Sequence, residues 1–570
     1  MEKEMKNGIK INKKKFIRNI IIVLIALGLV AAAFSIAPNF EKDEFEDGKM
    51  HLIINNKNLT STDRLSNEIF VENGVIYLSR DDVSRFFDTD LYFESKYNQY
   101  ITTSDTKVAA IPFGEYKMEV NGINTPIAGT IIEKEGVTYL PFSELKDIYN
   151  VEIQYNEANN IIVIDSLNRE QIKAEAKQDL NIKLKTRIIS RTIDKVKKGE
   201  KVVVVSKLQN GWTRVRTPSG KIGYIQTDKL QNETMVRQNM EVEKQLPVVS
   251  MVWDYYSTYK IAPNRTGTTI NGINVVSPAF FELKKLGKGE IIDKVGDSGK
   301  KYISWAKSNN YKIWAKFSNE SMIETTSEVL NDYKLRQRTI ESIVDLAVKY
   351  GLDGINLDME NIYKEDKDMF TRFVIELSPR LKDLGMCLSV DVTAPDGGDN
   401  WSLCYDRGAL ADNSDYLVFM AYDQHNASST KAGSVAGYNW VKTNINKFLG
   451  KQEGVAAEKL ILAIPLYCRY WIEDATGKIA ETKTVNMNNV NNFIKGKGEK
   501  TWDETTRQNY LEYKQGNNTV KMWIEDLQSV REKISLAREN NLAGVAFWSK
   551  DMEDEELWDM VNEMILNKNN

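Results

Sequence analysis

Eight short apolar runs in the second half of the chain constrain its fold more than any other feature of the sequence. From about Leu246 onward each run is followed by an amphipathic helical pattern, which is typical of repeated βα units. The runs are residues 247–253, 275–279, 312–317, 354–360, 386–392, 416–422, 460–465 and 544–548. Eight such units predict an α/β fold, a closed (β/α)8 barrel over residues 246–566, with polar side chains converging at the carboxyl ends of its strands.

The fourth run carries three polar residues at alternating positions, Asn356, Asp358 and Glu360. Side chains two residues apart on a strand point to the same face, so these three should line one cavity. The apolar residues between them would face the packed side. Two neighbouring carboxyl groups shift each other's pKa values apart, so that one keeps a proton and the other does not. The run therefore predicts acid–base catalysis, and the alternative is an ordinary amphipathic edge strand.

The run 353–360 resembles the signature strand of glycoside hydrolase family 18, the chitinase-like TIM-barrel enzymes, whose motif ends in Asp, any residue, Asp, any residue, Glu. Asn356 stands where most chitinases carry the first Asp, a variant that is similar to the subgroup of spore-cortex and other peptidoglycan N-acetylglucosaminidases. The resemblance implies that Glu360 is the general acid. It also implies that Asp358 orients the substrate's 2-acetamido group, whose oxygen attacks the anomeric carbon. Asn356 can hydrogen-bond Asp358 but cannot share a proton, which puts the chitinase proton relay in doubt.

The sixth run ends in a segment that resembles another motif of this family, with Tyr422, Asp423 and His425. The resemblance implies that the Tyr422 hydroxyl and Asp423 contact the acetamido group, while His425 contacts the sugar or has a structural role. Trp548 ends the eighth run, where a flat indole would stack beneath a pyranose ring. Asn356 is a further candidate for substrate binding, and weaker candidates for contact with the sugar are Tyr467, Arg469 and Trp253. A core position for Tyr422 and a solvent-facing Arg469 are the alternatives.

Composition excludes several classes of function. Lys and Arg number 76 against 80 Asp and Glu, so no basic surface predicts nucleic-acid binding. The 3 cysteines lack metal-site or disulfide-framework spacing. With only 2 histidines, His51 and His425, a Ser-His-Asp triad or a multi-histidine metal site has little to be built from. We expect no metal or other cofactor.

The N-terminus reads as a membrane signal. A Lys-rich segment, residues 1–19, precedes an uncharged apolar run, residues 20–37, which is about long enough to cross the hydrocarbon core. We expect a cytoplasmic start, a single transmembrane anchor and an extracellular catalytic domain. The small residues near Ala37 leave a cleaved signal peptide and secretion to the cell wall as the alternative.

Two further modules precede the barrel. Within residues 50–165 the segment 73–78 recurs as 135–140, and each copy is followed by a short helical pattern, 81–87 or 143–149. This small α+β repeat domain resembles the N-terminal domain of copper amine oxidases, a stalk or wall-contact module in bacterial surface proteins. Residues 179–231 alternate short β-rich runs with turns and resemble a bacterial SH3-like β-barrel. The polar flanks 167–178 and 232–245 are expected to be linkers or short helices.

The leading interpretation is an exported, membrane-tethered glycosidase that cleaves β-linked N-acetylglucosamine in peptidoglycan. A chitinase or chito-oligosaccharide hydrolase would use the same residues on another glycan. A noncatalytic carbohydrate-binding protein of the cell wall is the third interpretation, against which Asp358 and Glu360 weigh.

Overall fold

The computed structural model describes residues 21–22, 24–25, 45, 48–60, 65–237, 248–257 and 260–566. These residues form two compact units. The first contains residues up to 89, 113–116 and 126–243, and the second contains 90–112, 117–125 and the chain from 244 onward. Most of the predicted membrane segment, residues 20–37, lies outside the described residues. Within the described residues, no helix is both long enough and apolar enough to cross a membrane.

The second unit is built on a closed barrel of eight parallel strands, which confirms the predicted fold of this region. Neighbours around the ring follow the order β22, β21, β35, β29, β28, β27, β26, β25, and pairing of β22 with β25 closes it. In chain order the strands are β21 (Val249–Asp254), β22 (Val275–Pro278), β25 (Lys312–Ser318), β26 (Gly354–Asp358), β27 (Cys387–Val392), β28 (Tyr416–Met420), β29 (Leu460–Pro465) and β35 (Gly544–Trp548).

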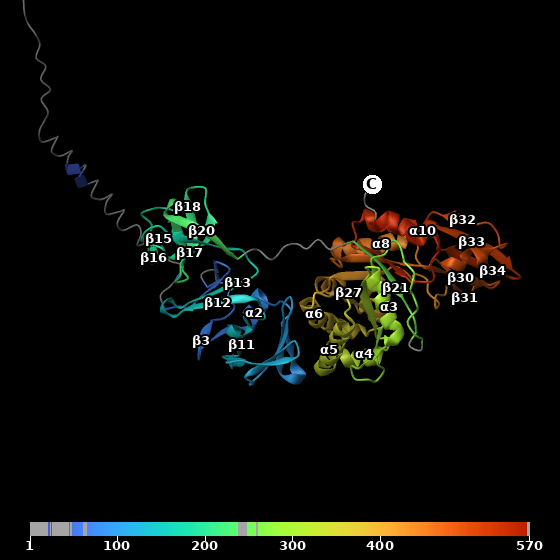
Figure 1. Cartoon of the computed structure of the whole chain (residues 1–570), viewed down its shortest axis with the longest axis horizontal. Helices are drawn as coiled ribbons and strands as arrows, with labels where there is room; N and C mark the ends of the chain where they lie inside the picture. The colour runs from blue at the N-terminus through green and yellow to red at the C-terminus, as the bar shows by residue number, and fades with distance from the viewer. Residues whose placement is uncertain are drawn as a thin grey trace, which may run out of the picture. The chain divides into compact units, whose positions relative to one another are not determined.

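Helices follow the strands and cover the outside of the barrel (Figure 1). They are α3 (Gly296–Ser308), α4 (Ile323–Leu330), α5 (Tyr333–Tyr350), α6 (Lys367–Asp383), α7 (Arg407–Asp412), α8 (Tyr438–Leu449), α10 (Leu527–Glu539) and α11 (Leu557–Val561). Local signals set their ends. For α5, the Asp332 side chain accepts from the backbone N–H of Leu335, and Gly351 ends the helix in the left-handed conformation.

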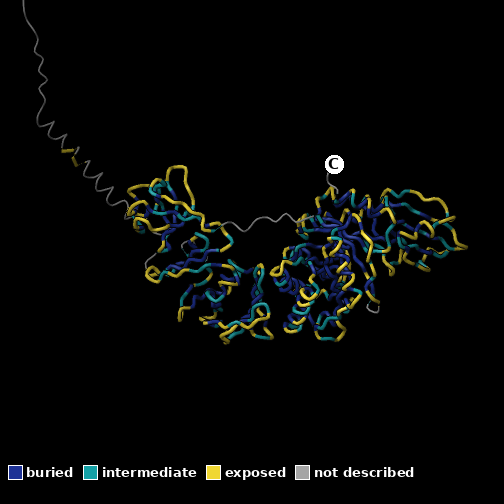
Figure 2. Tube along the Cα trace, in the orientation of Figure 1, coloured by how far each residue is buried: buried dark blue, intermediate teal, exposed yellow. Residues whose placement is uncertain are grey.

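Alternation along the strands separates two cores. On β28, Tyr416 and Val418 belong to an inner cluster, whereas Leu417 and Phe419 belong to the cluster between the barrel and its helices. Both clusters are buried, and exposed residues lie mainly in the peripheral loops (Figure 2). The interior of β25, β26 and β27 differs, because Lys316, Asn356 and Asp391 there are polar and buried.

An antiparallel sheet is inserted after the seventh barrel strand. Its order is β31, β30, β34, β33, β32. The strands are β30 (Tyr467–Glu473), β31 (Ile479–Asn486), β32 (Thr501–Asp503), β33 (Gln508–Gln515) and β34 (Asn518–Ile524), with the short helix α9 (Val490–Ile494) between β31 and β32. Its first strand begins at Tyr467, so it starts beside the carboxyl end of β29.

A second antiparallel sheet of this unit comes from the N-terminal part of the chain. It contains β5 (Tyr92–Glu94), β6 (Gln99–Thr103), β7 (Val108–Pro112), β8 (Lys117–Val120) and β9 (Ile123–Pro126). Ile101, Val108 and Ala110 pack with Tyr333 of α5 in one buried cluster. Arg336 of α5 is fully buried, forms a bidentate pair with Glu376 of α6 and reaches Glu94 of β5 at 3.5 Å.

The first unit holds the rest of the repeat. In the first copy β3 (Phe70–Glu72) and β4 (Val75–Ser79) lead into α2 (Arg80–Phe86), and in the second β10 (Ile132–Lys134) and β11 (Val137–Pro141) lead into a 3-10 helix at Phe142–Leu145. The two copies meet where β4 pairs with β11. The second predicted helix, 143–149, is thus replaced by a 3-10 helix at Phe142–Leu145 followed by turns over residues 146–150. A further sheet joins β1 (His51–Ile54), β2 (Lys57–Asn58), β12 (Val151–Asn156) and β13 (Ile161–Ser166).

A seven-stranded sheet completes the first unit. Its strands are β14 (Gln171–Ala176), β15 (Leu180–Lys183), β16 (Thr192–Val196), β17 (Lys201–Lys207), β18 (Trp212–Arg216), β19 (Ile222–Gln226) and β20 (Leu230–Arg237). The prediction of linkers or short helices was wrong over 171–176 and 232–237, because these residues lie in β14 and β20, which pair with each other. Ala174, Ala176 and Leu230 of these two strands are buried in the same core as the rest of the sheet, which explains why the polar flanks are ordered.

Candidate active site

One cavity opens at the carboxyl ends of the barrel strands. Its volume is about 170 Å³. It is lined by Trp253, Asp358, Glu360, Asp391, Met420, Tyr422, Asp423, Tyr467 and Trp548. Seven of these residues are among the ten candidates from the sequence. The end of β26 puts Asp358 at the cavity, and Glu360 follows two residues beyond the strand, which ends earlier than predicted.

Asp358 is held by an ion pair inside the barrel. Its Oδ2 accepts from the Lys316 ammonium group on the neighbouring strand β25, and both side chains are buried. Burial alone would lower the pKa of Lys316, but the charge and the hydrogen bond of Asp358 outweigh it and raise that pKa. Lys316 therefore stays charged and fixes one oxygen of Asp358. The other oxygen, Oδ1, is buried and has no hydrogen-bond partner among the described residues.

Glu360 has the properties of a general acid. Burial and the nearby charge of Asp358 raise its pKa from 4.5 to about 8, against an opposing effect of Lys316. The carboxyl group therefore carries a proton at neutral pH, as an acid catalyst must. Its backbone is clamped by the buried Asn319, whose Oδ1 accepts from the Glu360 N–H at 2.9 Å and whose Nδ2 donates to the Glu360 carbonyl at 2.8 Å.

Asn356 lies beneath the cavity, fully buried, and does not bond Asp358 as the sequence suggested. Its Oδ1 accepts from the Trp253 indole at 2.7 Å and from the Ser277 hydroxyl at 3.2 Å. Its Nδ2 donates to Ser389 at 3.0 Å and to Asp391 Oδ1 at 2.6 Å. An amide with both ends occupied has nothing left for a sugar, so the predicted role of Asn356 in substrate binding is wrong in this structure.

Two indoles form part of the cavity wall. Trp548 is partly exposed and meets Trp253 edge-on, with ring centroids 5.6 Å apart. Trp253 is only 1% exposed, and its N–H is occupied by Asn356, so Trp548 offers the more accessible face to a ligand. Tyr255 also packs against Trp548, with ring centroids 5.5 Å apart.

Three polar residues complete the cavity. The Tyr467 hydroxyl donates to Asp423 Oδ1 at 2.7 Å, and Asp423 has a left-handed backbone with φ of 58°. Tyr422 meets Tyr467 edge-on. Burial, together with the charges of Asp391 and Asp358, raises the pKa of Tyr422 well above its ordinary value, so its hydroxyl remains a donor.

His425 and Arg469 lie outside the residues that line the cavity. The ring of His425 is held elsewhere, with Nδ1 at 3.0 Å from the carbonyl of Ser434. Arg469 is partly buried, and its charge opposes the rise in the pKa of Tyr467 that burial and Asp423 cause. The structure therefore places Arg469 near the site and His425 in a structural position.

Comparison with known proteins decides the family. The profile of Glycosyl hydrolases family 18 matches residues 248–553, more than half of the chain. The chain belongs to this family. A second profile, that of the Copper amine oxidase N-terminal domain, matches residues 53–164. The resemblances to family 18 and to the copper amine oxidase N-terminal domain are confirmed, the SH3-like resemblance stays a prediction, and the protein is a glycoside hydrolase.

Three curated relatives match between 40% and 50% of this chain. The glycosylase YvbX of Bacillus subtilis (strain 168) is 28% identical over 301 residues, which cover 50% of this chain and 83% of YvbX. Human di-N-acetylchitobiase is 24% identical, covering 48% of this chain and 83% of its own length. The cortical fragment-lytic enzyme of B. subtilis is 23% identical, covering 40% of this chain and 54% of its own, so the match spans about half of that relative.

Three residues of this hydrolase escaped the sequence analysis, namely Lys316, Asn319 and Asp391. The same alternation that revealed Asp358 could have found two of them. On β25 Lys316 shares a face with Trp314 and Ser318, and on β27 Asp391 shares a face with Ser389. Asn319 lies just after β25, where alternation gives no signal.

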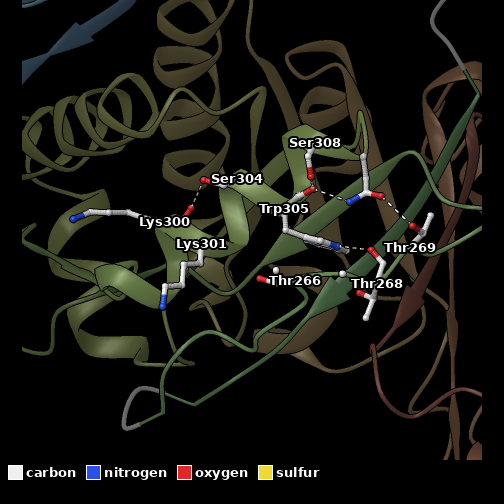
Figure 3. A pocket seen from close by; sticks show the side chains of 10 residues that line it. Thr266, Thr268, Thr269, Lys300, Lys301, Ser304, Trp305 and Ser308 are labelled. Atoms are coloured by element: carbon white, nitrogen blue, oxygen red, sulfur yellow. Dashed lines mark hydrogen bonds between the residues drawn. The ribbon is translucent and has the colours of Figure 1, made fainter.

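A larger hollow on the family 18 barrel, of about 630 Å³, lies elsewhere (Figure 3). It is lined by Thr266, Gly267, Thr268, Thr269, Lys300, Lys301, Ser304, Trp305, Ser308 and Asn309. Trp305 donates to the Thr268 carbonyl, and Thr269 bonds Asn309, just before the amino end of β25. The residues that line this hollow include no Asp or Glu and lie toward the amino ends of the strands, so the hollow cannot supply the general acid.

Proposed function

We propose that this family 18 hydrolase cleaves β-linked N-acetylglucosamine in peptidoglycan, with retention of configuration and with the substrate's own acetamido group as nucleophile. One observation supports it above all. The cavity holds an acid, Glu360, whose pKa is raised to about 8, beside a buried carboxylate, Asp358, that is paired with Lys316. Two carboxyl groups with opposite protonation states are what acid-assisted glycoside cleavage needs.

In the proposed reaction Glu360 donates its proton to the glycosidic oxygen as the bond to the anomeric carbon breaks. The acetamido oxygen attacks that carbon from the other side and forms a cyclic oxazolinium ion, so no protein carboxylate bonds the sugar. Asp358 accepts the acetamido N–H and stabilises the positive charge. Glu360, now ionised, takes a proton from the water that opens the ring and is thereby restored.

The remaining residues of the cavity would position the sugar. The Tyr422 hydroxyl can donate to the acetamido oxygen and so orient it toward the anomeric carbon. Asp423, oriented by Tyr467 at 2.7 Å, has a second oxygen for a sugar hydroxyl. The accessible face of Trp548 suits the apolar face of a pyranose ring.

Peptidoglycan is favoured as substrate by the relatives and by the accompanying modules. The cortical fragment-lytic enzyme is named for action on cortex fragments. The domain at residues 53–164 matches the copper amine oxidase N-terminal domain, and the sequence of residues 179–231 resembles a bacterial SH3 module; modules of both kinds occur in cell-wall proteins. A second candidate is a chito-oligosaccharide, which the relationship to di-N-acetylchitobiase supports.

We further propose that the catalytic barrel works outside the cell, held by an anchor at residues 20–37. The basic segment 1–19 and the apolar run that follows support this placement. In this arrangement the modules between residues 50 and 231 would hold the barrel at the wall.

Mass spectrometry of the products tests the proposal. Purified peptidoglycan and chitin oligosaccharides are incubated with residues 38–570, and the new reducing ends are identified. Muropeptides that end in N-acetylglucosamine support a peptidoglycan N-acetylglucosaminidase. Release from chitin oligosaccharides alone would favour the second candidate. Binding of both polymers without any release, equal to that of Glu360→Gln, would show a noncatalytic binding protein.

A further inference from the structure

Two buried carboxyl oxygens in the cavity have no hydrogen-bond partner in the part of the chain that the structure describes. They are Oδ1 of Asp358 and Oδ2 of Asp391. The other oxygen of each residue is occupied, by Lys316 for Asp358 and by the Asn356 amide at 2.6 Å for Asp391. Buried polar atoms are nearly always bonded, because leaving one unpaired costs free energy. A pair of unpaired oxygens in one cavity therefore needs an explanation.

The strand register places these two residues side by side. Strands β26 and β27 are parallel, and Leu357 pairs with Val390. The next residues along the two strands are Asp358 and Asp391, whose backbones are therefore about 4.8 Å apart. Two like charges on neighbouring strands repel, and more strongly when both are buried. The two carboxyl groups are stable together if one of them keeps a proton, because an acid O–H can then donate to a carboxylate oxygen.

The surroundings decide which residue keeps the proton. Asp358 has the ammonium group of Lys316, whereas Asp391 has only the neutral amide of Asn356. Burial and the charge of Asp358 raise the pKa of Asp391 well above its ordinary value. The other ionisable groups that face Asp391 are Glu360, Lys316 and Tyr422.

We propose that Asp391 is a positioning residue that remains protonated at neutral pH and donates a hydrogen bond from Oδ2 to Oδ1 of Asp358. Both residues line the same cavity, from neighbouring positions on two adjacent strands. Lys316 on one side and Asp391 on the other then fix the plane of the Asp358 carboxylate. The neighbouring strand supplies the acidic partner that Asn356 cannot be. This inference rests on the proposed function, in which Asp358 holds the acetamido group.

Steady-state kinetics with a fluorogenic chitotrioside test the inference. Asp391→Ala removes the donor, and kcat should fall about 10- to 100-fold, because hydrogen bonds to charged groups are of this strength, with KM changed little. Asp391→Asn should restore kcat to within about 3-fold of the wild type, since its oxygen can accept from Asn356 and its NH2 group can donate to Asp358. If Asp391 acts instead as a charged carboxylate, Asp391→Asn will be as impaired as Asp391→Ala, and the inference is wrong.

Infrared spectroscopy tests the proton without any substrate. In a Glu360→Gln background, which removes the other acid of the cavity, the carbonyl band of a protonated carboxylic acid should weaken when Asp391→Asn is added. The matched control adds Asp396→Asn, because Asp396 accepts from Trp440 and Asn444 away from the cavity. The control should leave the band unchanged. No difference between the two double variants at neutral pH would overturn the inference, whatever glycan the enzyme cleaves.

Discussion

Replacing Asn319 with Ala is a demanding test of how the general acid is held. The side chain is 1% exposed and bonds the Glu360 N–H at 2.9 Å, the Glu360 carbonyl at 2.8 Å and the Thr326 hydroxyl at 2.8 Å. Each buried hydrogen bond contributes about 0.5–1.5 kcal/mol, and the abandoned backbone groups add a further penalty. We therefore expect the free energy of unfolding to fall by about 2–4 kcal/mol.

Activity should fall as well, because Glu360 loses both backbone clamps. A displacement of about 1 Å in a catalytic group can cost about 100-fold in rate, so kcat should drop by about 10- to 100-fold. Urea unfolding followed by tryptophan fluorescence measures stability, and hydrolysis of a fluorogenic chitotrioside measures kcat. Asn331→Ala is the matched control, since that amide bonds Ser327 and Asp366 without contacting Glu360. An Asn319→Ala enzyme with kcat equal to that of the control would refute the idea that this clamp positions the acid.

Four further predictions concern the charges of the site. Activity, measured as kcat/KM, should fall tenfold per pH unit above the pKa of Glu360, about 8, because the acid form does the work; a flat profile to pH 10 would contradict this. Folding raises the pKa of Glu360 from 4.5 to about 8, so the free energy of unfolding should fall as pH rises from 4.5 to about 8, where Glu360 ionises more readily in the unfolded chain. Urea titrations of Glu360→Gln, which also abolishes hydrolysis, should lack this part of the pH dependence. Lys316→Met leaves Asp358 buried without its cation and should lower the free energy of unfolding by about 3–5 kcal/mol. Because Lys316 lowers the pKa of Glu360, the loss of kcat/KM at alkaline pH should begin at higher pH in this variant. A folded variant whose kcat/KM falls at the same pH as that of the wild type would count against the ion pair. A thiazoline mimic of the oxazolinium ion should inhibit the wild type and bind more weakly to Asp358→Ala and Tyr422→Phe, whereas a glycosyl ester trapped on Asp358 would exclude the substrate-assisted route.

Periodicity was sufficient to predict the barrel and the centre of its site. On β28 successive residues alternate between the inner and the outer core, and on β26 Asn356 and Asp358 share one polar face. Both patterns follow from the geometry of a strand, which repeats every two residues. The carboxyl ends of parallel strands meet at one rim of a barrel. Residues far apart in sequence, such as Asp358 and Trp548, are therefore expected in one cavity from their places at the ends of two apolar runs.

The errors share a physical cause. The sequence shows which face a side chain points to but not which neighbour takes its hydrogen bonds. Asn356 was expected to serve the substrate, yet Trp253, Ser277, Ser389 and Asp391 occupy it completely. Strands β14 and β20 were read as linkers because their exposed faces are polar, and only pairing across the sheet shows that they are ordered.

The packing of β5 to β9 on the barrel has a consequence for dissecting the protein. A truncation that starts at residue 246, where the family 18 barrel begins in sequence, would strip this sheet from α5 and α6. Tyr333 would lose the cover of Ile101, Val108 and Ala110, and Arg336 would keep Glu376 but lose Glu94. The isolated barrel would therefore expose an apolar face that is buried in the intact protein. Its tendency to aggregate would then reflect the missing sheet rather than low stability of the catalytic domain.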